Sequence, residues 1–256
     1  MIRTTAIIVA AGTGRRMNSS IKKQYMEIDG HPVLYYTIKA FEESNVDEIV
    51  IVTGADELEF VRNEIVEKYG FQKVSGICPG GRERFDSVYA GIRYVLSNGA
   101  EKDIEKDIAA DGRYVLIHDG VRMLVKPELI NRCIEAVCEN GACVAAVPVK
   151  DTIKECCVET PSFGQNTGKI TVEQTLDRSR LWQIQTPQCF EAELIRSAFE
   201  KMYSQPAEER IAITDDAMLV EVFTDHSVTA VEGDYKNIKI TTPEDIELAE
   251  FWLKRA

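Results

Sequence analysis

The chain has 256 residues, of which 30 are Lys or Arg and 42 are Asp or Glu, giving a formal net charge of −12 at pH 7. This length can form one α/β domain with a large core, and we expect a single domain over residues 1–256. The acidic balance argues against a general nucleic-acid or membrane-surface binder. No apolar run approaches the roughly 18 residues of a membrane-spanning helix.

The cysteine pattern and the N-terminus both indicate a cytoplasmic protein. Seven cysteines include no Cys-x-x-Cys pair, and the three histidines are scattered, which disfavours both zinc and a disulfide framework. Reduced thiols are the simplest interpretation, and they are typical of the cytoplasm. The apolar run at residues 7–11 is too short for the core of a signal peptide.

The first stretch with a chemical signature follows residues 6–11, an apolar run that predicts a buried parallel strand. Gly12 and Gly14 then allow a sharp turn that exposes backbone N–H groups. The first 26 residues hold five cations and no acid, namely Arg3, Arg15, Arg16, Lys22 and Lys23. A glycine turn with concentrated positive charge suits a polyphosphate site, although Gly-x-Gly after a strand is often only a tight turn.

Two familiar nucleotide-binding motifs fit the sequence poorly. A dinucleotide fingerprint would need a third glycine where Met17 stands, and no acid for a ribose follows the second strand at residues 47–53. A P-loop would need Ser or Thr where Ile170 stands, and residues 164–169 are one residue too short between their glycines.

Strands and helices alternate up to about residue 148, which predicts a mostly parallel sheet with helices on both faces. After the strand at 47–53, the further strands are expected at residues 73–78, 113–118 and 142–149. The helices are expected at residues 32–43 and 56–69, after the Gly80-Gly81 turn, and at residues 127–140. Residues 97–112 are charged and predict a solvated loop or a short surface helix.

Residues 150–176 are polar and contain strand-like segments at 151–155 and 169–175. The segment lacks the apolar residues for a core of its own, so we expect a protruding β-arm that packs on a second copy of the chain. The chain then returns through residues 181–188.

The C-terminal part predicts helices at about 191–203 and 215–223, with short strands near 228–232 and 237–240. The final helix has a clear start signal, because Thr242 can cap it and Pro243 occupies its first position. Two acids follow at its positive dipole end.

Three polar clusters follow predicted strands, at residues 12–23, 80–87 and 118–122. Ligands of such sheets bind outside the carboxyl ends of the strands, so we expect the clusters to meet. Asp119 can hold Mg²⁺ or fix a hydroxyl, although a turn role is the alternative. No histidine has an evident Ser or Cys partner. The chemistry indicated is charge stabilisation and positioning, as in phosphoryl or nucleotidyl transfer.

The ordered set of motifs resembles the 2-C-methyl-D-erythritol 4-phosphate cytidylyltransferase family over residues 4–255. The motifs lie at residues 10–17, 23–25, 80–84, 86–88, 118–122, 147–152, 177–178, 185–188, 213–217, 232–233 and 237–241. The resemblance implies a Rossmann-like fold of the nucleotide-diphospho-sugar transferase type. It also implies that CTP and the polyol phosphate give the CDP-alcohol and pyrophosphate, with Mg²⁺, in non-mevalonate isoprenoid synthesis.

The same resemblance implies roles for individual residues. Arg16 and Lys23 would stabilise charge at the α-phosphate, while Arg178 and Lys239 would aim the attacking phosphate oxygen. The nucleotide would be cradled by Ala10, Ala11, Gly12, Thr13, Gly14, Gly81 and Ser87. The acceptor would also be held by Asp119, Arg122, Thr152 and Thr186. Mg²⁺ would be held mainly by the CTP phosphates, with Asp119 as a possible ligand. The arm would cross to the partner of a homodimer.

Three departures from the family pattern concern loops and base contacts: Lys22 and Met123 stand where Pro is common, and Arg82 stands where an acid or small residue is common. The alternatives are a ribitol-5-phosphate cytidylyltransferase and a non-catalytic nucleotide-binding regulator. The Arg15-Arg16 pair and residues 149–154 favour methylerythritol phosphate, and the presence of Arg16 and Lys23 argues against the regulator.

Overall fold

The computed structural model describes residues 2–12, 21–102, 112–158 and 168–255. Its centre is a seven-stranded sheet in the order β11-β7-β10-β6-β1-β4-β5. The strands are β1 (Arg3–Val9), β4 (Glu48–Thr53), β5 (Val74–Pro79), β6 (Arg113–Asp119), β7 (Ala142–Pro148), β10 (Trp182–Glu191) and β11 (Thr229–Glu232). All neighbours pair in parallel except β10, which runs antiparallel to β6 and β7. The mostly parallel sheet is therefore confirmed.

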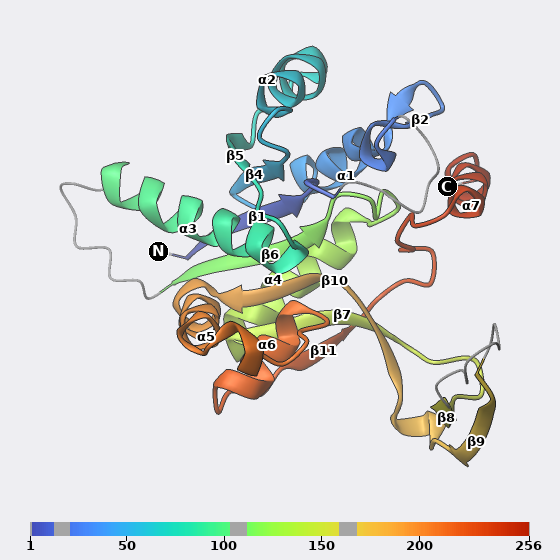
Figure 1. The fold of residues 1–256 in the computed structure, drawn as a ribbon. Coiled ribbons are helices and arrows are strands. Elements are labelled where there is room, and N and C mark those ends of the chain that lie inside the picture. Colours follow the sequence, from blue (N-terminus) through green and yellow to red (C-terminus); the bar gives the residue numbers. More distant parts are fainter. Residues whose placement is uncertain (1, 13–20, 103–111, 159–167, 256) are drawn as a thin grey trace.

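Helices cover both faces of this sheet (Figure 1). The helices α1 (Val33–Glu42) and α4 (Pro127–Asn140) pack on the face that receives Ile8 of β1. The helices α3 (Arg84–Lys102), α5 (Ala192–Ser204) and α6 (Asp216–Phe223) pack on the face that receives Ile7. Successive strand side chains point to opposite faces, so the apolar run of β1 contributes to both cores.

The remaining elements are short or lie at the margins of the sheet. Helix α2 (Leu58–Phe60) continues as a wider π-helical segment over Val61–Glu67. Two short strands, β2 (Glu27–Ile28) and β3 (His31–Pro32), pair with each other. Single 3₁₀ turns occur at Lys23–Tyr25, Arg178–Arg180 and Ala207–Glu209. Helix α7 (Pro243–Leu253) ends the chain, and its Asp245 Oδ2 accepts from the Thr242 N–H at 2.9 Å.

One sequence-based expectation about these elements was wrong. Residues 237–240 form no strand: the Ile240 N–H donates to the Val121 carbonyl at 3.1 Å, and the buried Asn237 side chain donates to the Thr186 carbonyl at 2.8 Å. The segment is held by loop contacts instead of a strand ladder. The charged stretch from residue 97 begins inside α3, which extends to Lys102; residues 103–111 lie outside the described residues.

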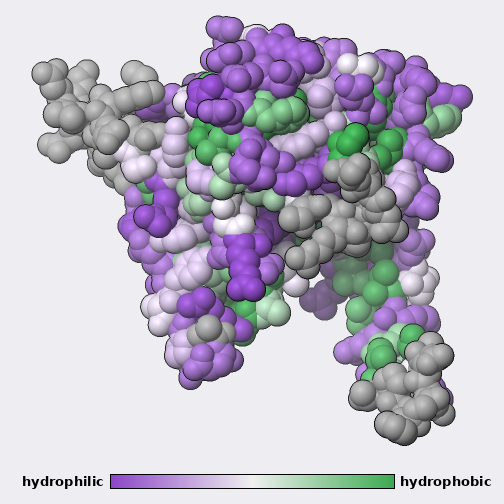
Figure 2. All heavy atoms as spheres, turned by 45° about the horizontal axis from the view of Figure 1, so that its top comes forward, coloured by the Kyte–Doolittle hydropathy of each residue, from purple (hydrophilic) through white to green (hydrophobic). Residues whose placement is uncertain are grey.

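The expected arm is a two-stranded antiparallel sheet that projects from the body of the molecule (Figure 1). It consists of β8 (Lys154–Val158) and β9 (Ile170–Thr175), so its first strand starts three residues later than expected. Val158 and Ile170 are opposite each other in the register and are 66% and 67% exposed. Figure 2 shows hydrophobic side chains on the surface of the arm. The arm thus exposes apolar area that it does not bury itself.

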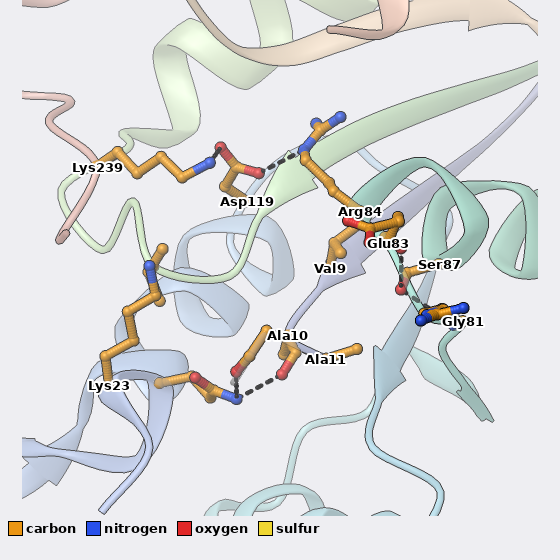
Figure 3. A pocket seen from close by; sticks show the side chains of 14 residues that line it. Val9, Ala10, Ala11, Lys23, Gly81, Glu83, Arg84, Ser87, Asp119 and Lys239 are labelled. Carbon is orange, nitrogen blue, oxygen red and sulfur yellow. Dashed lines mark hydrogen bonds and ion pairs between the residues drawn. The ribbon is translucent and has the colours of Figure 1, made fainter. Parts of the chain in front are cut away.

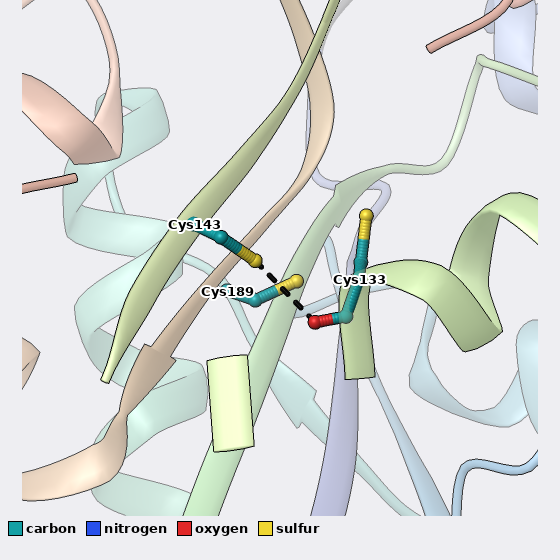
Figure 4. A group of neighbouring side chains, drawn as sticks. All are labelled: Cys133, Cys143 and Cys189. Carbon is teal, nitrogen blue, oxygen red and sulfur yellow. Dashed lines mark hydrogen bonds between the residues drawn. The ribbon is translucent and has the colours of Figure 1, made fainter. Parts of the chain in front are cut away.

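Three thiols that are far apart in sequence meet in the core (Figure 4). Cys133 of α4, Cys143 of β7 and Cys189 of β10 are fully buried, and their sulfurs lie within 4.8 Å of one another. Three thiolates can hold a soft metal ion, but these side chains are packed among apolar groups. Burial raises the pKa of the Cys189 thiol well above its usual value. We assign the three thiols to core packing.

Across the described residues, no helix is both long enough and apolar enough to cross a membrane.

Candidate active site

Two adjoining cavities lie at the carboxyl edge of the parallel strands. The first has a volume of about 320 Å³ and is lined by the segment after β1, the start of α3 and residues near the C-terminus. The second has a volume of about 290 Å³ and lies between the end of β6, β10 and the segment before α6. Arg84, Asp119 and Lys239 line both cavities. Ligands of open α/β sheets bind at this edge.

The turn after β1 is held in place by Gln24. This buried side chain donates from Nε2 to the Ala10 carbonyl at 2.6 Å and to the Gly12 carbonyl at 3.1 Å. Because both carbonyls are satisfied internally, the segment keeps a fixed path along the floor of the first cavity. The adjacent Lys23 lines the same cavity, and its Nζ donates to the Ile240 carbonyl at 3.0 Å.

The second glycine turn forms the opposite wall of the first cavity (Figure 3). The Gly81 N–H donates to Ser87 Oγ at 3.1 Å, and this hydroxyl donates to the Glu83 carbonyl at 3.1 Å. A Cβ on Gly81 would lie 2.3 Å from the Cβ of Asp86. The glycine is therefore required by a close approach within the chain itself, which fixes the turn before any ligand binds.

Asp119 lies at the end of β6 among three cations. Its Oδ1 is 3.1 Å from Arg84 Nε, and its Oδ2 is 2.9 Å from Lys239 Nζ and 3.5 Å from Arg122 Nε. Burial by itself would raise the pKa of this carboxyl, but the three cations lower it well below the usual value. The group is therefore ionised throughout the physiological pH range, and the shared wall of the cavities is a network of charges.

Comparisons with known proteins agree with this geometry. The family model described as 2-C-methyl-D-erythritol 4-phosphate cytidylyltransferase matches residues 4–255. Proteins named 2-C-methyl-D-erythritol 4-phosphate cytidylyltransferase from Lachnospira eligens and Alkaliphilus oremlandii are 46% and 44% identical to the chain. Each alignment covers 98% of this chain, with 99% and 95% of the respective relative.

The chain belongs to this cytidylyltransferase family. Among solved structures, it is similar to the 4-diphosphocytidyl-2C-methyl-D-erythritol synthase from Anaerococcus prevotii, with a TM-score of 0.76 and 32% identity. The superposition covers 99% of this chain and 97% of that one. The Rossmann-like fold expected from the sequence is thus confirmed.

The structure brings most of the residues predicted for the cytidylyltransferase site to the two cavities. The first cavity is lined by Ala10, Ala11, Gly12, Lys23, Gly81, Ser87, Asp119 and Lys239. The second is lined by Asp119, Arg122, Thr186 and Lys239. Thr13, Gly14 and Arg16 lie outside the described residues, so their roles stay predictions.

Thr152 and Arg178 line neither cavity of their own chain. Both are exposed near the base of the arm, and Arg178 Nη1 donates to the Lys150 carbonyl at 2.7 Å. Their roles at the acceptor site therefore stay predictions.

Sequence reasoning missed two polar residues that organise the site. Arg84 joins Asp119 to Asp216, and Gln24 holds the turn after β1. Arg84, Gln24 and Asp216 belong to motifs that carry the family resemblance, but the contact of Arg84 with Asp216 joins positions 132 residues apart. The available signal was their presence in those motifs, which does not specify a partner.

A buried hydrogen-bond chain supports Asp119 from behind. The Asp119 N–H donates to Thr186 Oγ1 at 3.2 Å, and this hydroxyl lies 3.0 Å from His118 Nδ1. His118 Nε2 lies 3.5 Å from the Arg122 carbonyl, which can only accept, so we assign the proton of the neutral ring to Nε2. In this tautomer Nδ1 accepts from the Thr186 hydroxyl, which keeps one lone pair for a ligand. Burial is the main cause that lowers the pKa of His118 to about 3.

We expect this histidine to make the protein acid-sensitive. The pKa of an unfolded histidine is about 6.5, so between that pH and about 3 the unfolded state binds a proton that the folded state does not. The free energy of unfolding must therefore fall as the pH drops below about 6.5. Between pH 7 and 5, denaturant titrations should show wild type losing about 2 kcal/mol more than His118→Gln. Equal losses in the two proteins would contradict this, and His226→Gln is the exposed control.

Proposed function

We propose that this chain transfers the cytidylyl group of CTP to 2-C-methyl-D-erythritol 4-phosphate and releases pyrophosphate, in isoprenoid biosynthesis. The observation that carries the proposal is the pair of adjoining cavities that share Asp119 and Lys239. One cavity offers fixed backbone turns and Lys23 to a nucleoside triphosphate. The other offers cations to a second phosphate ester.

The nucleotide half is the first cavity. The turns at Ala10–Gly12 and at Gly81 present backbone to the ligand, and neither can shift easily because each is held by an internal side chain. Such preorganised groups stabilise charge without reorganisation during the reaction. We assign Lys23, together with Arg16, to the negative charge that develops around the α-phosphate.

The acceptor half is the second cavity. Within the described part of the chain, the buried Nε of Arg122 makes no hydrogen bond; its ion-pair partner is Asp119 Oδ2, at 3.5 Å, and the residue lines this cavity. A buried donor that makes only this long contact carries a free-energy cost, which a shift of the guanidinium toward an incoming anionic or hydroxyl oxygen would relieve. Lys239 supplies a second cation beside it. This donor set suits the phosphate and hydroxyls of a polyol phosphate.

The reaction assigned to this site is a direct displacement. A phosphate oxygen of the acceptor attacks the α-phosphorus of CTP, the new P–O bond forms, and the bond to the β-phosphate oxygen breaks as pyrophosphate leaves. Ser87 brings a hydroxyl group to the first cavity. Because this hydroxyl donates its proton to the Glu83 carbonyl, it is poorly placed to act as a nucleophile. The protein then acts by alignment and charge stabilisation.

Mg²⁺ is part of the proposal as a companion of CTP. Among the residues that line the first cavity, the carboxylates are Glu83 and Asp119, and both oxygens of Asp119 already face cations. The donor set therefore fits an ion held mainly by triphosphate oxygens, with Asp119 as the protein oxygen within reach. When bound, the ion would offset negative charge on the triphosphate.

The substrate assignment is tested by pyrophosphate release. Purified protein with CTP and Mg²⁺ should release pyrophosphate rapidly with methylerythritol 4-phosphate and at least about tenfold more slowly with ribitol 5-phosphate, because hydroxyl placement decides binding in a polar pocket. The reverse preference would move the substrate to ribitol phosphate. CTP binding without any turnover would favour a regulator.

We infer further that the active unit is a homodimer held through the arm. Val158, Ile170 and Val172 are exposed in the single chain. The arm of a second copy has the same apolar surface, so packing the two arms together would bury these side chains. Replacing Ile170 with Lys should shift the protein to monomers in sedimentation velocity, since a charge buried at an apolar interface is strongly unfavourable. Thr171→Lys, on the other face of β9, is the matched control. Unchanged sedimentation of Ile170→Lys would contradict the arm interface.

The cytoplasm is the compartment we propose. All seven cysteines lie in the described residues and are free thiols, which suits a reducing compartment.

A further inference from the structure

Arg84 stands on the wall between the two cavities, although neither the sequence motifs nor the proposed mechanism gives it a task. It is the first residue of α3, and its side chain reaches across the edge of the sheet to Asp119 (Figure 3). It lines the nucleotide cavity and the acceptor cavity alike. The Arg84 side chain is 29% exposed: it lines the cavities on one side and contacts protein on the other.

The protein side of this guanidinium is anchored by a buried acid. Arg84 Nη1 and Nη2 donate to Asp216 Oδ1 at 3.0 Å and Oδ2 at 2.8 Å, a bidentate pair in which the carboxylate is only 1% exposed. Such a pair fixes orientation as well as distance. With both Nη atoms held by Asp216, the Nε–H has a fixed direction, and it donates to Asp119 Oδ1 at 3.1 Å.

Asp216 is itself held by the strand that joins the arm to the site. Gln188 of β10 accepts from the backbone N–H groups of Asp216 and Ala217 at 3.0 and 2.9 Å, and it donates to Asp215 Oδ2 at 2.9 Å. Asp215 also caps α6 by accepting from the Met218 N–H. Asp216, which anchors Arg84, is thus held in place and does not shift when the Asp119 carboxylate moves.

The two oxygens of Asp119 consequently have different partners. Oδ1 is held by Arg84, whereas Oδ2 faces Lys239 and Arg122. A carboxylate fixed at one oxygen cannot turn both oxygens onto Lys239. Lys239 and Arg122 therefore keep donors that can turn to an incoming phosphate.

We propose that Arg84 is a positioning residue for the acceptor half of the site: it holds Asp119 at one oxygen, with Asp216 as its fixed anchor. The inference rests on the function proposed above. It assigns a task to two conspicuous charges, Arg84 and Asp216, that otherwise form only a buried ion pair. Loss of Arg84 should disturb use of the polyol phosphate much more than use of CTP.

The test separates positioning from structural support with a double variant. Arg84→Met leaves Asp216 buried and unpaired, so it should lower the melting temperature and raise the KM for methylerythritol 4-phosphate by about tenfold or more, the size of one lost charge-assisted hydrogen bond. Adding Asp216→Asn removes the unpaired charge, so the melting temperature should recover. The KM for the acceptor should stay raised, and the KM for CTP should stay within about twofold of wild type.

Two further variants complete the comparison. Arg84→Lys keeps the charge but cannot span both acids, so it too should raise the acceptor KM, and it provides the result if Arg84→Met does not fold. Arg93→Met, on the exposed side of the same helix, should match wild type. Recovery of the acceptor KM in the double variant, or an equal rise in both KM values, would overturn the positioning role. Failure of wild type to transfer cytidylyl groups to this acceptor would instead overturn the proposed function.

Discussion

Replacing Lys23 with alanine is expected to lower kcat by about 10²- to 10³-fold, the loss measured when one preorganised donor is removed from a charge-stabilising site. The Kd for CTP should change by less than about fivefold, because a cation that faces developing charge is needed most in the transition state. Lys23 reaches the nucleotide cavity from a 3₁₀ turn, and its Nζ is held by the Ile240 carbonyl. Its ammonium is thus positioned before the substrate arrives.

Rapid-quench turnover and calorimetric titration of CTP measure these two quantities separately. The neighbouring Lys22 is the matched control, because its Nζ pairs with Glu57 at 2.8 Å and the residue lines neither cavity. Lys22→Ala should retain nearly full activity. Equal losses of kcat and CTP affinity in Lys23→Ala would make it a binding residue only. Equal effects at both lysines would point to a general loss of positive charge.

A mixture of two inactive variants should regain activity if the arm serves the neighbouring subunit. Lys23→Ala damages the body of the site, and Arg178→Ala damages the base of the arm, where Arg178 is exposed and distant from its own cavities. In a mixed dimer, one site would combine an intact body with an intact arm. One of its two sites would be intact, so the isolated mixed dimer should show about half of wild-type activity.

The experiment requires subunit exchange, achieved by co-expression with two different tags and isolation of the mixed dimer. Homodimers of each variant, treated identically, provide the baseline. If Arg178 acts on its own subunit, both sites of the mixed dimer stay defective and no activity returns. That result would assign the arm to assembly alone.

Local sequence signals predicted the regular elements well. The helix at residues 127–140 begins and ends where expected, because Pro127 suits its first position and Gly141 takes the left-handed conformation (φ 74°) that ends it. The strands of the sheet were also recognisable, since both faces of a parallel sheet are buried and its strands read as apolar runs. These features depend on residues within one turn or one strand of each other.

Features that depend on distant partners were missed or misjudged. Residues 237–240 have strand-like alternation, but the amide of the buried Asn237 donates to the Thr186 carbonyl. The backbone here is therefore placed by contacts of the site and does not form the hydrogen-bond ladder of a strand. The bidentate contact of Arg84 with Asp216 joins positions 132 residues apart. Spacing within a motif carries no information about such a contact. The three core thiols escaped prediction for the same reason.

The antiparallel strand β10 has a mechanical consequence. One end carries the half-exposed Trp182 next to the arm, while the other end carries Gln188, which grips the start of α6 and thereby the anchor of Arg84. After the 3₁₀ turn at Arg178–Arg180, β10 thus joins the base of the arm to the start of α6, with an irregularity between Ile184 and Gln188. A displacement of the arm would therefore be transmitted through β10 to Gln188 and so to Asp216, the anchor of Arg84.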